Sequence, residues 1–333
     1  MGFSPLDFYK LLIVEDETEI LKYMILCVDG GGTKTHILLM EDNGLVLSQG
    51  FGGPMLFTEI SFEQAVNNLN TAISEASQKI KRQILTFTKV IIGLAGVDSK
   101  NEIEQAREKY TLALRQKVSG EIILVNDMMI ALLSGTDNNN AVVLNAGTGS
   151  ACFGFNQSGI KAKASGLDYL ISDEGSAFYI GQEILRAAVK SYDGRGKKTI
   201  LEDLVKQYYS IEDLVDIKSK IYGLNFHKAH IAKLSFLITQ ASQANDEVAQ
   251  TILRDAMKEL AIAIKAVVSK LEIGRIDFDL VLIGGLFTSN TINPKAFGNI
   301  INNMYPMAKI IIPKDPPVYG ARKLALLHSK HDD

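Results

Sequence analysis

Short apolar runs alternate along this chain with longer segments in which apolar side chains recur every three or four residues. The runs that we interpret as buried strands are residues 24–28, 90–94, 121–125, 141–144, 280–283 and 310–312. Between the first two runs, residues 61–83 have the spacing of an amphipathic helix, with Ser61 or Thr58 as its candidate N-cap. Regular alternation of strands and helices predicts an α/β fold.

The same spacing predicts further helices in the rest of the chain. They are residues 101–117, 176–191, 199–209, most of 227–241, 245–271 and 317–328. Gly44 and residues 50–54 mark turns in a hairpin-rich region near the start. Residues 8–17 resemble the first strand and acidic turn of a response-regulator receiver, but nothing else of a receiver follows. We therefore expect residues 1–23 to be an extension that packs as a helix or an edge strand.

Three of the apolar runs lead directly into glycine-rich turns. These turns are Asp29-Gly30-Gly31-Gly32-Thr33-Lys34-Thr35, Asn145-Ala146-Gly147-Thr148-Gly149-Ser150 and Gly284-Gly285-Leu286. Glycine lets backbone N–H groups approach phosphate oxygens, and hydroxyl and ammonium groups add donors. Asp29, at the end of its strand, can hold a hydrated Mg²⁺. A plain hairpin would explain the first turn alone, but three such turns indicate two related lobes that close on one nucleotide.

Other nucleotide-binding motifs are missing from the sequence. No G-x-x-x-x-G-K-[ST] occurs, and Gly196-Lys197-Lys198-Thr199 does not have that spacing. No G-x-G-x-x-G follows a predicted strand, which disfavours a dinucleotide-binding fold.

Two acidic residues are candidates for a general base. Phosphoryl transfer to an alcohol needs a carboxylate that accepts the hydroxyl proton. Asp98 ends one predicted strand and Asp127 follows another, so each would project from the edge of the sheet. N-capping of the following helix is the simpler explanation for either residue. Asp173, before a third helix, could likewise be a cap or a first-turn acid.

Composition and charge narrow the classes of partner. The chain has 333 residues, 47% hydrophobic and 22% charged, with a net charge of −3, and this length suggests about two domains. No basic block calls for nucleic acid or a membrane surface, and no apolar stretch approaches the ~20 residues of a membrane span. Cys27 and Cys152 fit a reducing cytoplasm, as small buried hydrophobes. We expect a cytoplasmic protein without a secretory signal.

Taken together, these motifs resemble the actin/hexokinase/Hsp70 ATPase superfamily, and within it the branch of N-acetylglucosamine kinases and BadF/BadG-type ATPases. Besides the three turns, the matching segments are Gly93-Leu94-Ala95-Gly96-Val97-Asp98, Val125-Asn126-Asp127, Ser172-Asp173-Glu174-Gly175-Ser176, Asp193-Gly194-Arg195-Gly196 and Pro316-Pro317-Val318-Tyr319-Gly320-Ala321. They follow the family order from Met24 to about Leu327.

The resemblance implies a two-lobed actin-like (ribonuclease H-like) fold, in which each lobe is a mixed five-stranded sheet flanked by helices. The expected boundaries are an extension at 1–23, a first lobe at 24–120 with the C-terminal helix 317–330, and a second lobe at 121–316. The implied activity is transfer of the γ-phosphoryl group of MgATP to a hydroxyl of a small sugar. ATP and Mg²⁺ are the expected cofactors, and a homodimer is the expected assembly.

The resemblance also implies roles for individual residues. Phosphate binding falls on Gly30, Gly31, Gly32, Thr33, Lys34, Thr35, Gly147, Thr148, Gly149, Ser150, Gly284 and Gly285, with Asp29 at the metal. In the N-acetylglucosamine kinase branch the base falls on Asp98, whereas in related bacterial sugar kinases it falls on Asp127. We favour Asp98, with Asp127 as a ligand for substrate or metal-bound water. Asn126, Gly166 and Asp173 complete the expected sugar contacts.

Two departures from the family pattern fall on the acceptor site. Family sugar kinases carry an asparagine after the Gly-Pro near position 54, where this chain has Met55-Leu56, and a Gly-Trp-Gly where it has Gly166-Leu167-Asp168. A sugar acid such as 2-keto-3-deoxygluconate is therefore an alternative acceptor to N-acetylglucosamine.

Two other classes of function stay open. A BadF-type ATPase that activates a partner 2-hydroxyacyl-CoA dehydratase needs cysteines for an intersubunit iron–sulfur cluster. Cys27 and Cys152 are poorly placed for one, because both lie in predicted buried strands. A nucleotide-binding regulator without turnover is the other class, and the presence of Asp98, Asp127 and Asp173 together argues against it.

Overall fold

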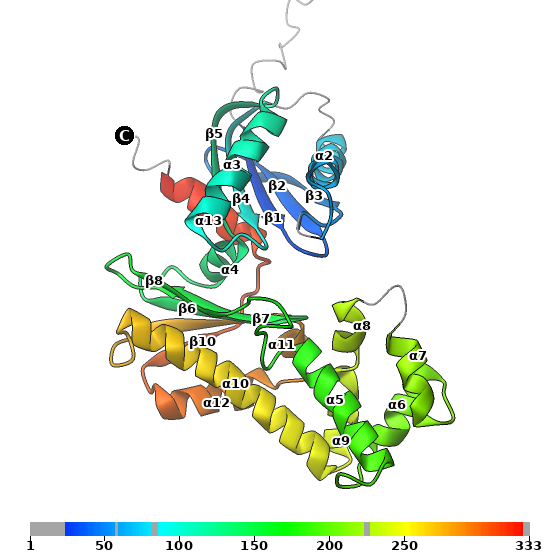
Figure 1. The fold of residues 1–333 in the computed structure, drawn as a ribbon. Helices are drawn as coiled ribbons and strands as arrows, with labels where there is room; N and C mark the ends of the chain where they lie inside the picture. The colour runs from blue at the N-terminus through cyan, green and yellow to red at the C-terminus, as the bar shows by residue number, and fades with distance from the viewer. Residues whose placement is uncertain (1–23, 57–58, 81–85, 223–226, 329–333) are drawn as a thin grey trace, which may run out of the picture. The chain divides into compact units, whose positions relative to one another are not determined.

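The computed structural model describes residues 24–56, 59–80, 86–222 and 227–328 (Figure 1). The chain divides into two compact units. Unit 1 runs up to Ser134 and resumes at Pro316, and unit 2 is Gly135–Asp315. The receiver-like segment within residues 1–23 lies outside the described residues. Among the described residues, no helix combines the length and apolarity that crossing a membrane requires.

Unit 1 is built on a mixed five-stranded sheet with the strand order β3-β2-β1-β4-β5. Its elements are β1 (Met24–Gly30), β2 (Thr35–Glu41), β3 (Val46–Gly52), α2 (Phe62–Lys79), β4 (Phe87–Leu94), α3 (Lys100–Leu114), β5 (Val118–Asn126), α4 (Asp127–Gly135) and α13 (Val318–His328). Strands β1, β4 and β5 are parallel, while β2 and β3 form the antiparallel hairpin that the early glycines predict.

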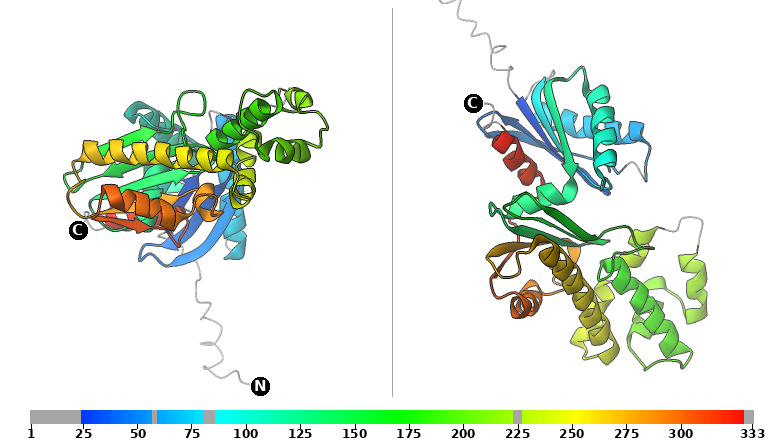
Figure 2. Two further views of the ribbon diagram at one scale, coloured as in Figure 1. Left: turned by 90° about the horizontal axis from the view of Figure 1, so that it is seen from below. Right: turned by 60° about the vertical axis from the view of Figure 1, so that its left-hand side comes forward.

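Helices cover both faces of this sheet, as Figures 1 and 2 show. Leu26 and Val28 of β1 pack with α2 and α3 on one face. Ile25 and Cys27 pack with α4 and α13 on the other face. A strand that is buried on both faces carries apolar side chains at every position, which explains the unbroken apolar run that begins at Met24.

The boundary expected between the lobes is wrong by one strand and one helix. The apolar run at 121–125 is expected to begin the second lobe, which would place residues 121–134 there. Instead β5 pairs in parallel with β4, with Ile123 opposite Ile91. Helix α4 then packs on the same sheet through Ile130, directly over Gly93, where a Cβ would lie 2.2 Å from the Ile130 Cδ1 atom. Unit 2 therefore begins at Gly135.

Unit 2 is built on a second mixed five-stranded sheet, with the order β10-β9-β6-β7-β8. Its elements are β6 (Ala141–Ala146), β7 (Ser150–Phe155), β8 (Lys161–Ser165), α5 (Ala177–Tyr192), α6 (Leu201–Tyr209), the 3₁₀ turn η2 (Leu214–Asp216), α7 (Ile217–Ile221), α8 (Lys228–Lys233), α9 (Phe236–Gln243), α10 (Glu247–Leu271), β9 (Phe278–Ile283), α11 (Gly285–Thr288), α12 (Pro294–Met304) and β10 (Ala308–Ile311). The long helix α10 packs on β7 and β8, and one continuous apolar core joins it to the helices α5 to α9.

The capping signal read from the sequence is confirmed at the start of α2. The hydroxyl oxygen of Ser61 accepts the N–H of Gln64 (3.1 Å) and begins α2. The last helix, α13, packs on the first sheet through Val318 and Ala321, as the expected position of residues 317–330 implies. The helical stretch predicted within 227–241 is interrupted, because α8 ends at Lys233 and α9 begins at Phe236.

Candidate functional site

Three candidate acids of unit 1, Asp29, Asp98 and Asp127, lie at one edge of its sheet. The three parallel strands β1, β4 and β5 end at this edge, and their register places Asp29 opposite Gly93, and Leu94 opposite Asn126. Asp98 follows β4 by a short turn, and Asp127 is the first residue after β5. Ligands of parallel sheets bind at the carboxyl ends of the strands, so the topology brings together four of the residues that the sequence singled out.

The glycine-rich turn between β1 and β2 presents its donors to solvent. The turn is closed by a hydrogen bond from the Gly31 N–H to the Lys34 carbonyl oxygen (3.0 Å). Gly32, Thr33 and Lys34 are exposed. Thr35 is different, because it is buried and its hydroxyl donates to the Gly53 carbonyl oxygen (2.6 Å). Gly32, Thr33 and Lys34 can therefore contact a phosphate from the solvent side. Thr35 instead stabilises the turn through its hydrogen bond to Gly53.

Met55 and Leu56 support this turn. The Met55 N–H donates to the Gly31 carbonyl oxygen (3.0 Å), and the Met55 side chain is fully buried. A Cβ on Gly30 would lie 3.0 Å from the Met55 sulfur, and one on Gly32 would lie 3.3 Å from a Leu56 methyl carbon. The residues that replace the family's asparagine thus pack against the turn.

Asp29 lies in an unusual electrostatic environment. Burial, and then the charge of Asp127, raise the pKa of Asp29 to about 7, and Lys34 offsets part of this rise. A cation beside these carboxyl groups would offset the burial of Asp29 and its repulsion from Asp127. In the described ranges no three His, Cys, Asp or Glu side chains gather into a metal site. The coupled carboxyl groups of Asp29 and Asp127 are oxygen ligands of the kind that a hydrated Mg²⁺ takes, with water and phosphate oxygens completing its shell.

Asp98 does not cap a helix. Ser99 is the N-cap of α3, and with Glu102 it forms a reciprocal capping box. The Asp98 side chain instead accepts a hydrogen bond from the Asn126 amide nitrogen (3.1 Å), which also donates to the Val97 carbonyl oxygen (2.8 Å). The carboxylate is exposed. Asn126 thus orients an acid that the solvent, or a substrate, can reach.

Asp127 opens helix α4, so part of the capping explanation holds for it. The cap contact itself comes from Asn126, whose amide oxygen accepts the Met128 N–H (2.9 Å). Asp127 lies in the first turn, where the helix dipole favours a negative charge. The amide of Asn126 therefore connects Asp98 to the start of α4, a link that the sequence motif did not reveal.

In unit 2, two glycine turns lie side by side. Strands β6 and β9 are parallel, with Asn145 opposite Ile283, so their turns leave the sheet at the same edge. Gly284 has φ of +103°, and a Cβ there would lie 2.4 Å from the backbone of Ala146. Gly285 has no atom within 4 Å of its missing Cβ. This combination of close backbone approach and open space suits an anion bound by backbone N–H groups.

Ser150 and Asp173 hold the neighbouring turn together. The Ser150 hydroxyl donates to the Glu174 carbonyl oxygen (2.7 Å), and its N–H donates to the Asp173 carboxylate. Asp173 is buried with φ of +71°, and a Cβ on Gly149 would lie 2.4 Å from its Oδ2 atom. Burial raises the pKa of Asp173, and the bond from Ser150 opposes that rise. In this turn Thr148 is exposed, whereas Ser150 is buried and bonded to both Asp173 and Glu174.

Asp173 is not the cap of the following helix either. Ser176 caps α5 by accepting the Tyr179 N–H (3.1 Å). A capping role for Asp173, which the sequence left open, is therefore excluded, and its burial in an uncommon backbone conformation needs another reason.

Sequence reasoning missed an ion pair beside the expected sugar-contacting segment. Lys228, at the start of α8, lies 2.9 Å from an Asp168 carboxylate oxygen. The charge of Lys228 also acts on Asp173. Gly166, close by in the chain, has φ of +78° and lies tightly against Ala151. Sixty positions separate Asp168 from Lys228, so no local pattern could have paired them.

Residues 26–325 match the model of the BadF/BadG/BcrA/BcrD ATPase family. The chain belongs to this family. A relative from Clostridium acetobutylicum, named N-acetylmuramic acid/N-acetylglucosamine kinase, is 33% identical over 301 residues, which cover 90% of this chain and 97% of the relative. An N-acetyl-D-glucosamine kinase of Dictyostelium discoideum is 30% identical over 319 residues, which cover 93% and 99%.

A solved structure from Chromobacterium violaceum, whose proposed activity is N-acetylglucosamine kinase, superposes with a TM-score of 0.72 at 20% identity. The superposition covers 91% of this chain and 99% of that one. The two-lobed actin-like α/β fold that the resemblance implied is confirmed, with one five-stranded sheet in each unit.

Proposed function

We propose that this chain is a kinase that transfers the γ-phosphoryl group of MgATP to a hydroxyl of a small sugar. The observation that carries the proposal is the exposed Asp98 carboxylate, held by Asn126 at the sheet edge where the first glycine turn ends. The family membership and the two relatives named as N-acetylglucosamine kinases support it.

In unit 1, we assign Asp98 as the general base that accepts the proton of the acceptor hydroxyl. One Asp98 oxygen accepts from Asn126, which fixes the carboxylate for this role. Gly30, Gly31, Gly32, Thr33 and Lys34 would bind phosphate oxygens, and Thr35 would hold the turn. Asp29 and Asp127 would hold Mg²⁺ through its water. When bound, Mg²⁺ neutralises negative charge on the phosphates.

In unit 2, Gly147, Thr148, Gly149, Gly284 and Gly285 would bind the nucleotide through backbone N–H groups. Their support is the open space at Gly285 and the exposure of Thr148. Ser150 would act indirectly, since its N–H donates to the Asp173 carboxylate and its hydroxyl donates to the neighbouring Glu174 carbonyl oxygen. Asp173 and Gly166 would contact the sugar hydroxyls.

N-acetylglucosamine is the acceptor that the names of the relatives favour. A sugar that carries a carboxylate is the second candidate, and Lys228 is the observation that favours it. Its ammonium group pairs with the exposed carboxylate of Asp168. Its positive charge also lowers the pKa of the buried Asp173. An acidic acceptor could therefore replace Asp168 as the partner of Lys228.

Activation of a partner dehydratase is disfavoured by the cysteines. The chain has only two, and both are fully buried in strands of the sheets. Burial raises the pKa of Cys27 to about 12, whereas an iron–sulfur cluster is held by thiolates. Neither thiol is therefore positioned for a cluster shared between subunits.

The test is ADP release from MgATP, measured without acceptor and then with N-acetylglucosamine, N-acetylmannosamine, glucose, glucosamine, N-acetylmuramic acid, 2-keto-3-deoxygluconate and gluconate. Strong stimulation by a neutral amino sugar or by a sugar acid would establish the kinase and its acceptor class. Hydrolysis that ignores every acceptor would contradict the proposal. Sedimentation of the same sample tests the proposed homodimer.

A further inference from the structure

A groove in unit 2 is lined by residues that the proposed phosphotransfer does not use. Its volume is about 870 Å³, within the range of small-molecule sites. Helices α5, α7 and α8 and the segment around Leu170 form its walls. The apolar side chains that line it include Tyr169, Leu170, Phe178, Val189, Ile221 and Ile231.

The groove is elongated along helix α5. Phe178 lies in the first turn of this helix and Lys190 in the last, and both line the groove. Twelve residues of α-helix span about 18 Å. At the Phe178 end, the Tyr169 ring packs on the Phe178 ring with centroids 4.8 Å apart. An extended apolar chain fits this shape better than a compact sugar does.

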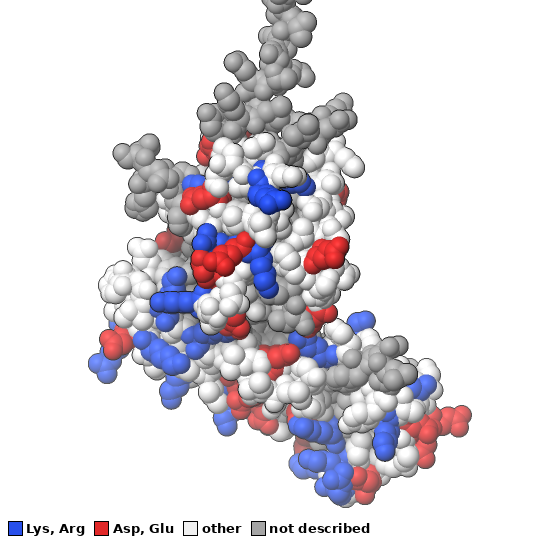
Figure 3. Space-filling view, turned by 45° about the horizontal axis from the view of Figure 1, so that its top comes forward, with Lys and Arg blue, Asp and Glu red and all other residues white. Residues whose placement is uncertain are grey.

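Positive charge lines the same groove. Arg186 pairs with Glu183, but Lys190 and Lys218 have no acidic partner among the described residues. Figure 3 shows Lys and Arg side chains at the lower end of unit 2, with Asp and Glu side chains beside them. An apolar trough lined by two lysines without acidic partners is complementary to a molecule with an apolar body and an anionic head.

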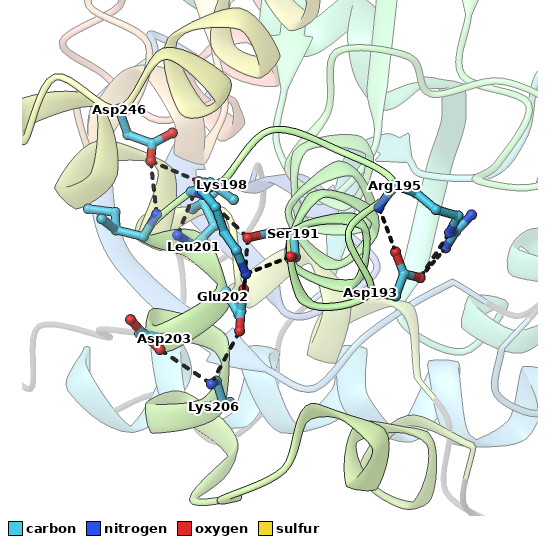
Figure 4. A network of polar contacts seen from close by, with 11 residues as sticks. Ser191, Asp193, Arg195, Lys198, Leu201, Glu202, Asp203, Lys206 and Asp246 are labelled. Carbon is cyan, nitrogen blue, oxygen red and sulfur yellow. Dashed lines mark hydrogen bonds and ion pairs between the residues drawn. The ribbon is translucent and has the colours of Figure 1, made fainter.

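A polar network fixes the Lys190 end of the groove (Figure 4). The Ser191 hydroxyl donates to Glu202 (2.7 Å), and the Lys198 ammonium donates to the Ser191 carbonyl oxygen (2.9 Å). Asp246 accepts the Ile200 N–H (2.9 Å) and also caps α10. These bonds connect the end of α5 to α6 and α10. This part of the groove is therefore preorganised for a ligand.

Large apolar side chains at the groove are left in contact with water. Leu170 is 83% exposed and Tyr222 is 77% exposed, and both line the groove. Exposed apolar groups that converge on one concavity indicate a binding surface.

We propose that this groove binds a linear acyl carboxylate, with its chain along α5 and its head group at Lys190 and Lys218. The chain would cover Leu170, Tyr222 and the apolar wall, and the carboxylate would supply the anionic partner of the lysines. This site goes beyond the proposed kinase activity, and its test needs no turnover.

The experiment is displacement of the fluorescent anion 1-anilinonaphthalene-8-sulfonate by decanoate, hexanoate and decan-1-ol, all kept below micelle formation. Decanoate should displace the probe at least about tenfold more effectively than hexanoate, because each buried methylene adds affinity. Decanoate should also displace the probe at least about threefold more effectively than decan-1-ol does, because only the carboxylate can pair with the lysines. Equal displacement by hexanoate and decanoate would overturn the proposal.

Variants locate the site. Lys190→Glu and Tyr222→Asp should each weaken decanoate binding by about fivefold or more. Lys265→Glu and Leu112→Asp are the matched controls, since both positions are exposed and line no part of the groove. They should leave binding unchanged, and thermal unfolding checks that all four variants fold. Decanoate binding that ignores Lys190→Glu and Tyr222→Asp would refute the proposal. So would sedimentation showing that Tyr222→Asp dissociates a dimer, because a second copy would then occupy the groove.

Discussion

Replacing Asp29 by asparagine should stabilise the protein at neutral and alkaline pH when no metal is bound. The pKa of Asp29 is raised from 3.8 to about 7 by burial and by Asp127. The unfolded chain therefore loses this proton near pH 4, whereas the folded protein keeps it until about pH 7. Since the unfolded state binds fewer protons in this window, folding stability falls as pH rises through it and stays lower above it.

The size of the effect follows from the shift. A change from 3.8 to about 7 corresponds to about 4 kcal/mol if it is fully expressed. Asp29 is only partly shielded from solvent, so we expect Asp29→Asn to raise the free energy of unfolding by about 2 kcal/mol at pH 8. The gain should be less than half of that at pH 5, where the wild-type carboxyl is still protonated.

Urea unfolding at pH 5 and pH 8, without Mg²⁺ and with MgATP, measures this difference. Asp277→Asn is the matched control for the loss of one carboxylate, because Asp277 is exposed. MgATP should stabilise the wild type more than Asp29→Asn, since the variant lacks the carboxylate proposed to hold the ion. An Asp29→Asn protein that is equally or less stable than the wild type at pH 8 would refute the electrostatic reasoning.

Three further predictions concern catalysis and the acceptor. Asp98→Asn should lower kcat by about 100-fold or more while ATP still binds in calorimetry, and wild-type turnover would contradict the base assignment. Gly149→Ala places a Cβ 2.4 Å from the Asp173 Oδ2 atom, so we expect a rise in acceptor KM, and an unchanged acceptor KM would show that Asp173 does not touch the sugar. Lys228→Ala should raise KM for an acidic acceptor by about fivefold and leave a neutral sugar unaffected, whereas equal effects on both would mean that Lys228 only positions Asp168.

The sequence predicted the elements well because their signals are local. Five consecutive apolar residues indicate that both faces of β1 are buried, and Ser61 indicates where α2 begins. The apolar run at 121–125 does not indicate which strand it pairs with, because any buried parallel strand has a similar composition. Only the ladder with β4 assigns β5 and α4 to unit 1.

The candidate site shows the same division. The glycines and acids stand out because few residue types can approach a phosphate or accept a proton. The contacts that orient them are made by common residues far away in sequence. Asn126 reaches Asp98 across 28 positions and Lys228 reaches Asp168 across 60. The resemblance predicts a phosphate contact for Ser150, whereas the structure shows that its hydroxyl donates to the Glu174 carbonyl oxygen, 24 positions away.

The departure at Met55 bears on which acceptor the site selects. A buried methionine under Gly30 cannot donate or accept a strong hydrogen bond, so the polar contact that an asparagine there would offer a sugar is absent. Its backbone N–H donates to the Gly31 carbonyl oxygen, so this position supports the glycine-rich turn after β1. We therefore expect discrimination among acceptors to come from other groups, and Asp173, Asp168 and Lys228 are charged residues at the expected sugar segment. Asp168 and Lys228 form an ion pair with each other. A negatively charged acceptor would compete with Asp168 for Lys228, whereas a neutral sugar would leave the ion pair intact. The acceptor panel and the Lys228→Ala variant therefore both test whether Lys228 pairs with an acidic acceptor. The panel changes the charge of the ligand, and the variant changes the charge of the protein.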